Sequence, residues 1–120
     1  MNKRIVIVLA ALIGSLALLS APSVSFAQAG GSDDTVEGGP GDDLIRGGPG
    51  ADVLMGGPGD DLIEGGAGND TIEGGPGADE LEGGAGNDTI EGGPGDDVIE
   101  GGQGADKIEG GTGDDEVTAD

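Results

Sequence analysis

An aspartate recurs every nine residues along most of the chain. The members of this series are Asp34, Asp43, Asp52, Asp61, Asp70, Asp79, Asp88, Asp97, Asp106 and Asp115. Glycines occupy three fixed positions before nine of these aspartates, and glycine permits positive φ and close backbone approach, so a tight loop can turn main-chain carbonyls inward. Carboxylates and carbonyls together form an all-oxygen shell, which suits a hard cation. Calcium accepts six to eight such ligands in loose geometry, whereas magnesium needs a strict octahedron, so the pattern favours calcium.

The aspartate belongs to a nine-residue unit, Gly-Gly-x-Gly-x-Asp-x-aliphatic-x. Nine intact copies run without a gap over residues 38–118, and a degenerate tenth copy covers residues 29–37, where Ala29 and Ser32 replace two of the glycines. The last three residues of each unit alternate between an aliphatic inner position and polar neighbours, which predicts a very short strand. So short a strand is stable only when copies stack and pair with one another, about 4.8 Å apart.

This unit resembles the calcium-binding nonapeptide of the repeat-in-toxin (RTX), or hemolysin-type, family. The resemblance covers every residue after the first 28 and implies an all-β fold, a right-handed parallel β-roll (a β-helix solenoid) with two repeats per turn. Odd and even repeats would then stack separately, with calcium ions between vertically adjacent loops. Five loops enclose four gaps and four loops enclose three, so about seven Ca²⁺ ions are expected, plus one if the degenerate copy joins the stack.

The resemblance also assigns the ligands. The loop backbone carbonyls would contribute, and Asp34 of the degenerate copy is a further candidate. The expected side-chain ligands are Asp43, Asp52, Asp61, Asp70, Asp79, Asp88, Asp97, Asp106 and Asp115.

Composition narrows the function classes. The chain has 25 acidic and 4 basic residues, a net charge of −21, a single aromatic residue and neither His nor Cys. Soft-metal sites and disulfides are therefore excluded, and a nucleic-acid partner is not expected because the basic footprint and the stacking platform are missing. One aliphatic core residue in nine cannot offset the entropy of ordering a glycine-rich chain, so the repeats are expected to be disordered without calcium.

The first 27 residues have the order of a secretory signal peptide. Lys3 and Arg4 precede an apolar run over residues 5–19, and Ser25 and Ala27 supply small residues before the expected cleavage. The 15-residue run is shorter than the roughly 20 residues of a spanning helix, so no membrane span is expected after cleavage. The expected organisation is a signal peptide (1–27), a degenerate N-terminal repeat or cap (28–37), one β-roll (38–118) and a short tail (119–120).

The favoured function is a secreted, extracellular, non-enzymatic calcium-binding protein whose β-roll folds on binding several ions. Carboxylate pairs such as Asp42 and Asp43 recur in copy after copy, so none is distinct enough to indicate catalysis. The alternative is an extracellular structural, adhesive or matrix protein that calcium holds together, with an unidentified surface or matrix partner. Ice binding is not expected, because Thr112, Asn69 and Asn87 do not form a regular array.

Overall fold

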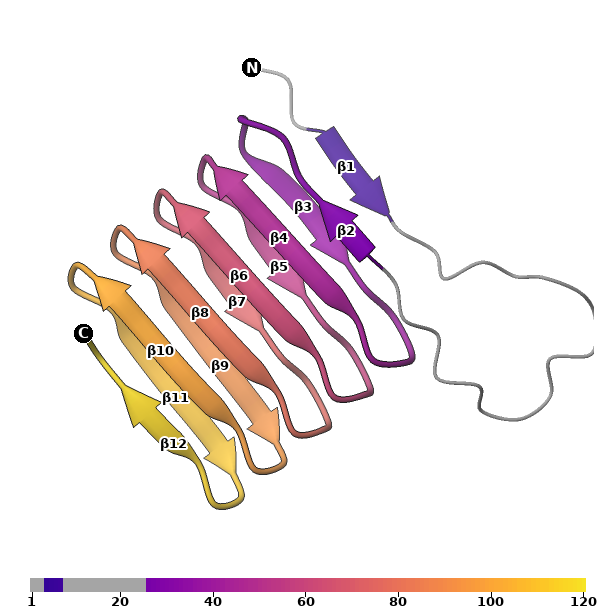
Figure 1. Cartoon of the computed structure of the whole chain (residues 1–120), viewed down its shortest axis with the longest axis vertical. Coiled ribbons are helices and arrows are strands. Elements are labelled where there is room, and N and C mark those ends of the chain that lie inside the picture. Colours follow the sequence, from indigo (N-terminus) through magenta and orange to yellow (C-terminus); the bar gives the residue numbers. More distant parts are fainter. Residues whose placement is uncertain (1–3, 8–25) are drawn as a thin grey trace, which may run out of the picture.

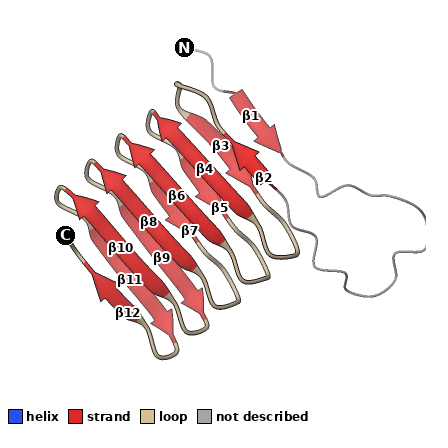
Figure 2. Cartoon of the chain, in the orientation of Figure 1, coloured by secondary structure: helices blue, strands red, loops and turns tan. Residues whose placement is uncertain are grey.

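Each nine-residue repeat forms half a turn of a flattened coil. The structure is a computed structural model that describes residues 4–7 and 26–120. Figures 1 and 2 show two layers of strands joined by tight loops at both long edges, with no helix among the elements drawn. The predicted all-β parallel roll is confirmed. Within the described residues, no helix is long and apolar enough to cross a membrane.

Within the described residues, twelve strands make up two six-stranded sheets. In chain order they are β1 (Arg4–Ile7), β2 (Phe26–Gln28), β3 (Asp34–Glu37), β4 (Leu44–Pro49), β5 (Val53–Met55), β6 (Leu62–Ala67), β7 (Thr71–Glu73), β8 (Glu80–Ala85), β9 (Thr89–Pro94), β10 (Val98–Gln103), β11 (Lys107–Thr112) and β12 (Glu116–Thr118). The first sheet has the order β1-β3-β5-β7-β9-β11 and the second has the order β12-β10-β8-β6-β4-β2. All neighbouring strands are parallel, and from β2 onward paired residues are 18 positions apart, as in Ile45 opposite Ile63.

Many strands are longer than the sequence predicts. Six of them continue for six residues, through the first three positions of the next repeat, instead of ending at the ninth position. The glycines of adjacent turns pair directly, as in Gly48 opposite Gly66, because no side chain separates their backbones. A Cβ on Gly66, whose φ is +113°, would lie 2.5 Å from the carbonyl oxygen of Gly48. Glycine here therefore allows strand pairing as well as a turn.

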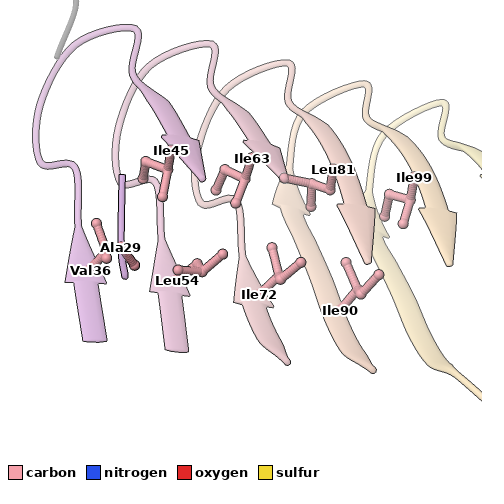
Figure 3. Close-up of a cluster of buried hydrophobic side chains, with 9 residues drawn as sticks. All are labelled: Ala29, Val36, Ile45, Leu54, Ile63, Ile72, Leu81, Ile90 and Ile99. Atoms are coloured by element: carbon pink, nitrogen blue, oxygen red, sulfur yellow. The ribbon is translucent and has the colours of Figure 1, made fainter. Parts of the chain in front are cut away.

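The core is a double column of aliphatic side chains from the eighth position of the repeats. Those from one sheet face those from the other in Figure 3, and all of them are at most 1% exposed. The column consists of Val36, Ile45, Leu54, Ile63, Ile72, Leu81, Ile90 and Ile99. At the last turn the column opens, since Ile108 is only partly buried and Val117 is 47% exposed.

The degenerate repeat is part of the roll. The N–H of Ala29 donates to the carbonyl of Arg46 at 2.8 Å, and Val36 is fully buried. Both replaced glycines are therefore tolerated at this end of the stack. The predicted signal peptide lies mostly outside the described residues. Of that segment, the structure describes β1 and the first two residues of β2, each of which is the outermost strand of its sheet at this end.

Candidate metal centre

The repeated aspartates point into the roll and form two columns. One contains Asp34, Asp52, Asp70, Asp88 and Asp106, and the other contains Asp43, Asp61, Asp79, Asp97 and Asp115, as their turn-to-turn hydrogen bonds show. The eight from Asp34 to Asp97 are 1–3% exposed, while Asp106 and Asp115 at the C-terminal end are partly buried. Buried ionisable groups in such number require compensation, because an isolated charge in a low-dielectric interior is strongly disfavoured.

In the eight aspartates from Asp52 to Asp115, one carboxylate oxygen joins neighbouring turns. Its Oδ1 accepts the backbone N–H of the aspartate 18 residues earlier, and these eight bonds of 2.7–3.1 Å, four in each column, run from one end of the column to the other. Asp79 takes part in two of them: its Oδ1 accepts from Asp61 and its own N–H donates to Asp97. Oδ1 thus has a structural role that does not depend on any ion.

The other carboxylate oxygen is buried without a hydrogen-bond partner. This holds for the Oδ2 atoms of Asp52, Asp61, Asp70, Asp79, Asp88, Asp97 and Asp106. A buried oxygen that carries charge and has no donor is costly, and native proteins satisfy nearly all such atoms. A row of these atoms at one repeat position therefore fits a cation as their partner.

The space beside each Oδ2 is bounded by oxygen atoms. A Cβ added to Gly65 would meet Asp70 Oδ2 at 2.6 Å and the carbonyl oxygen of Gly83, one turn further on, also at 2.6 Å. The same pair of contacts recurs at the first glycine of the other central repeats. The structure therefore adds the first glycine of the repeat to the candidate site. Its carbonyl oxygen borders the space, and its lack of a side chain keeps the space open. The invariant Gly-Gly pair was the signal for it.

The donor set fits calcium. Within the described residues no three acidic side chains converge on one point, so each gap would combine one or two carboxylates with main-chain carbonyls. Calcium accepts such a mixture of charged carboxylate and neutral carbonyl oxygens in irregular geometry, whereas magnesium requires a regular octahedron. The equivalent carbonyl of Gly74 accepts the N–H of Gly57 at 2.9 Å. Since a carbonyl oxygen has two lone pairs, one remains for an ion.

Burial raises the pKa values of the central repeated aspartates when no metal is bound. Desolvation raises the pKa of Asp61 to about 7 and the pKa values of Asp70 and Asp79 to about 6, against the lowering effect of the backbone hydrogen bonds to Oδ1. Burial also raises the pKa values of Asp52, Asp88 and Asp97. Neighbouring carboxylates in the column contribute in the same direction, which is the expected behaviour of stacked anions without a cation.

Asp34 differs from the other aspartates. Its Oδ2 accepts the N–H of Gly30 at 2.9 Å, and its Oδ1 lies 3.4 Å from the Ser32 hydroxyl, which donates to it. The residues of the degenerate repeat thus satisfy the oxygen that has no hydrogen-bond partner in the seven aspartates from Asp52 to Asp106. Asp34 is consequently the weakest of the ten candidate ligands.

The fifth residue of the repeat forms a second, exposed ladder that the sequence pattern did not reveal. The Oδ1 atoms of Asp33, Asp42, Asp60, Asn69, Asn87 and Asp96 each accept the N–H of the fifth residue of the next turn, at 2.8–3.0 Å. These bonds run in the opposite direction from those of the buried aspartates. The variable Asp, Asn and Ala at this position hid the role, since only the first two can accept such a bond.

Comparisons with known proteins agree with this geometry. The family model of the RTX calcium-binding nonapeptide repeat (4 copies) matches residues 28–63, 55–90 and 82–117, which together cover three quarters of the chain. No curated protein and no solved structure matches the chain.

Proposed function

Because the chain belongs to the family of RTX calcium-binding nonapeptide repeats, we propose that it is a secreted, non-enzymatic calcium-binding protein whose roll folds when ions occupy the gaps between its loops. The observation that carries this proposal is the row of buried Oδ2 atoms without a hydrogen-bond partner. Bound calcium would supply positive charge beside these oxygens. The chain itself would orient the ligands, leave space for the ion and exclude water.

The chain's residues hold the site in three ways. The Oδ1 hydrogen bonds fix each carboxylate in one orientation, so that Oδ2 faces the gap. The first glycine of each repeat leaves the gap free of side-chain atoms and brings a carbonyl of the next turn close to it. The aliphatic column on the inner side excludes water, which strengthens any charge interaction there.

Eight gaps are available for ions. The degenerate repeat joins its column, so each column has five loops and four gaps, and one Oδ1 hydrogen bond spans each gap. The proposed number is thus about eight, the seven of the intact repeats plus one that Asp34 helps to form. Divalent ions in these gaps would offset most of the net charge of −21.

Folding would then depend on the compartment. Calcium that binds only the folded chain stabilises it by an amount that grows with free calcium at every site. Before export, at low calcium, the acidic repeats would remain unfolded; outside the cell, they would order. The nine intact loops repeat one arrangement without a chemically distinct copy, which supports a binding rather than a catalytic role.

Far-ultraviolet circular dichroism during a calcium titration tests the proposal. We expect a disordered spectrum in chelator, a cooperative rise of β signal with calcium, and a much smaller change at equal magnesium, because magnesium does not accept an irregular carbonyl cage. A full β signal in chelator would contradict folding coupled to calcium.

A further inference from the structure

The C-terminal end of the stack exposes core residues and strand edges. β11 and β12 are the outermost strands of their sheets at this end. Val117 is 47% exposed and Ile108 is partly buried, whereas their equivalents in earlier turns are at most 1% exposed. Within the described part of the chain, nothing pairs with the outer edges of these two strands, and such edges are templates for pairing with another chain.

At the opposite end, β1 is a strand added outside the regular winding. It pairs with β3, but Arg4 lies opposite Asp34, a separation of 30 residues instead of the 18 of every other pair. β2 covers the outer edge of β4 at the regular spacing. The outer edges of β3 and β4 are therefore occupied by residues 4–7 and 26–28, both outside the ten repeats.

The two ends of the repeat array are in phase. Residues 29–118 contain ten repeats, which make five whole turns. If a second copy continued the winding, its β11 would take the place of β1 against β3, with Ile108 opposite Val36. The aliphatic column would then continue across the junction with one aliphatic residue per strand, as it does between turns.

The second sheet has the same match. The β12 of the second copy would take the place of β2 against β4, with Val117 opposite Ile45. The N–H groups of Asp106 and Asp115 would face the carboxylates of Asp34 and Asp43, which repeats the turn-to-turn bond made at every earlier aspartate. One register between the two copies therefore satisfies the strand pairing, the aliphatic column and the hydrogen bonds between aspartates of adjacent turns.

We propose that copies of this chain stack head to tail, with β11 and β12 of one copy replacing β1 and β2 on the N-terminal end of the next. The junction encloses two further gaps, each lined by aspartates of both copies, so the candidate ion sites there are incomplete without the partner copy. Since both ends are acidic, stacking rests on the proposed calcium binding to offset their repulsion. The contact is heterologous and does not close, so it generates filaments rather than a dimer.

This geometry also gives the first residues of the chain a second role. While residues 1–27 are attached, β1 and β2 cover the docking edges; their removal leaves β3 and β4 open. Stacking would consequently begin only after the leader is removed.

Sedimentation velocity with a matched pair of variants tests the proposal. The chain is secreted through its own leader, its first residue is read by mass spectrometry, and its folding is followed by circular dichroism in the same samples. We compare Val117→Lys with Val98→Lys, because the two valines are 47% and 49% exposed but only Val117 lies at the end of the core column. Val98 lies on the outer face of β10.

In calcium, the wild-type chain and the Val98→Lys variant should form species that grow with concentration, and Val117→Lys should weaken association at least tenfold while it keeps the β signal. A folded wild-type chain that remains monomeric overturns the proposal, as does equal association of the two variants. Association of the leader-bearing precursor as strong as that of the secreted chain would also overturn it. A chain without any β signal in calcium instead contradicts the proposed calcium-coupled folding.

Cross-linking provides a measurement that does not depend on the variants. In a head-to-tail stack Lys107 of one copy lies beside the strand that contains Glu37 of the next, whereas within one copy three strands, β5, β7 and β9, separate the strands of the two residues. A zero-length amine-to-carboxylate reagent should yield the Lys107–Glu37 product in calcium and lose it in chelator. Its absence from associated material would overturn this register.

Discussion

The two oxygens of the buried aspartates from Asp52 to Asp97 have different roles. Oδ1 accepts an N–H from the preceding turn and so contributes to the fold, while Oδ2 has no hydrogen-bond donor and faces the candidate site. The first role needs only an oxygen that accepts a hydrogen bond, whereas the second needs the negative charge. An Asp→Asn substitution keeps an acceptor for the turn-to-turn bond and removes the charge, so it separates the two.

Acidification should stabilise the metal-free roll. Burial raises the pKa of Asp61 to about 7 and that of Asp79 to about 6, above the ordinary value of 3.8 that applies in the unfolded chain. Between about pH 4 and pH 7 the folded chain therefore holds protons that the unfolded chain has lost, and its stability falls as pH rises through this range. In chelator, the β signal in circular dichroism should increase from pH 7.5 to pH 4.

A pair of variants checks the origin of this effect. Asp61→Asn cannot titrate at that position and should show a weaker pH dependence than the wild-type chain. Asp114→Asn removes an exposed carboxylate at the C-terminal end and should behave like the wild-type chain. A β signal that falls on acidification would contradict the assignment of the raised pKa values to the folded state.

At the scale of the strand and loop, the glycines allow both the pairing of strands in adjacent turns and the open space beside the buried aspartates. The second and fourth glycines adopt positive φ, whereas the first does not and is needed for space. The first glycine is therefore the better position at which to separate ion binding from backbone conformation.

Gly65→Ala should impair calcium-dependent folding. The new Cβ would lie 2.6 Å from both Asp70 Oδ2 and the Gly83 carbonyl oxygen, so it would occupy the gap between the two proposed ligands. Gly31→Ala is the control, because a Cβ there meets nothing within 4 Å. The calcium concentration at the midpoint of the folding transition should rise at least threefold for Gly65→Ala and stay unchanged for Gly31→Ala. Equal midpoints would show that the gap is not the binding site.

The sequence predicts which residues form the core and the strands better than it predicts where each strand ends. The nine-residue period fixes the core column and the buried aspartates, because a side chain that recurs at one position of a repeat faces one direction in the stack. Strand length was underestimated, since glycine is ordinarily depleted in strands and pairs here only because the turns stack in register. The ladder through Asn69 and Asn87 was missed because it is a contact between turns at a variable position.

At the scale of the molecule, each turn contacts only the turns beside it. From β2 onward the paired strands are those 18 residues apart, and the aliphatic column packs between the two sheets. Stability is then a sum over neighbouring turns, as in other solenoids. A defect in the middle divides the stack, whereas a defect at the end shortens it.

Asp79→Asn should therefore raise the calcium midpoint of folding clearly more than Asp115→Asn. Asp79 is 2% exposed and bonded to the turns on both sides, while Asp115 is partly buried and its Oδ1 accepts from Asp97 in the preceding turn. A calcium titration of both variants by circular dichroism measures the difference. Equal shifts would indicate loops that bind ions independently of one another.

The same winding has a mechanical consequence. The first and last strands of the repeats lie at opposite ends of the stack (Figure 1), so tension between the termini acts along the stacking axis and separates neighbouring turns from one another. Each turn that separates releases 18 residues, about 60 Å of extended chain. Where calcium occupies the gaps, the ions lie across these junctions, so the force that the chain withstands would be set by the concentration of calcium around it.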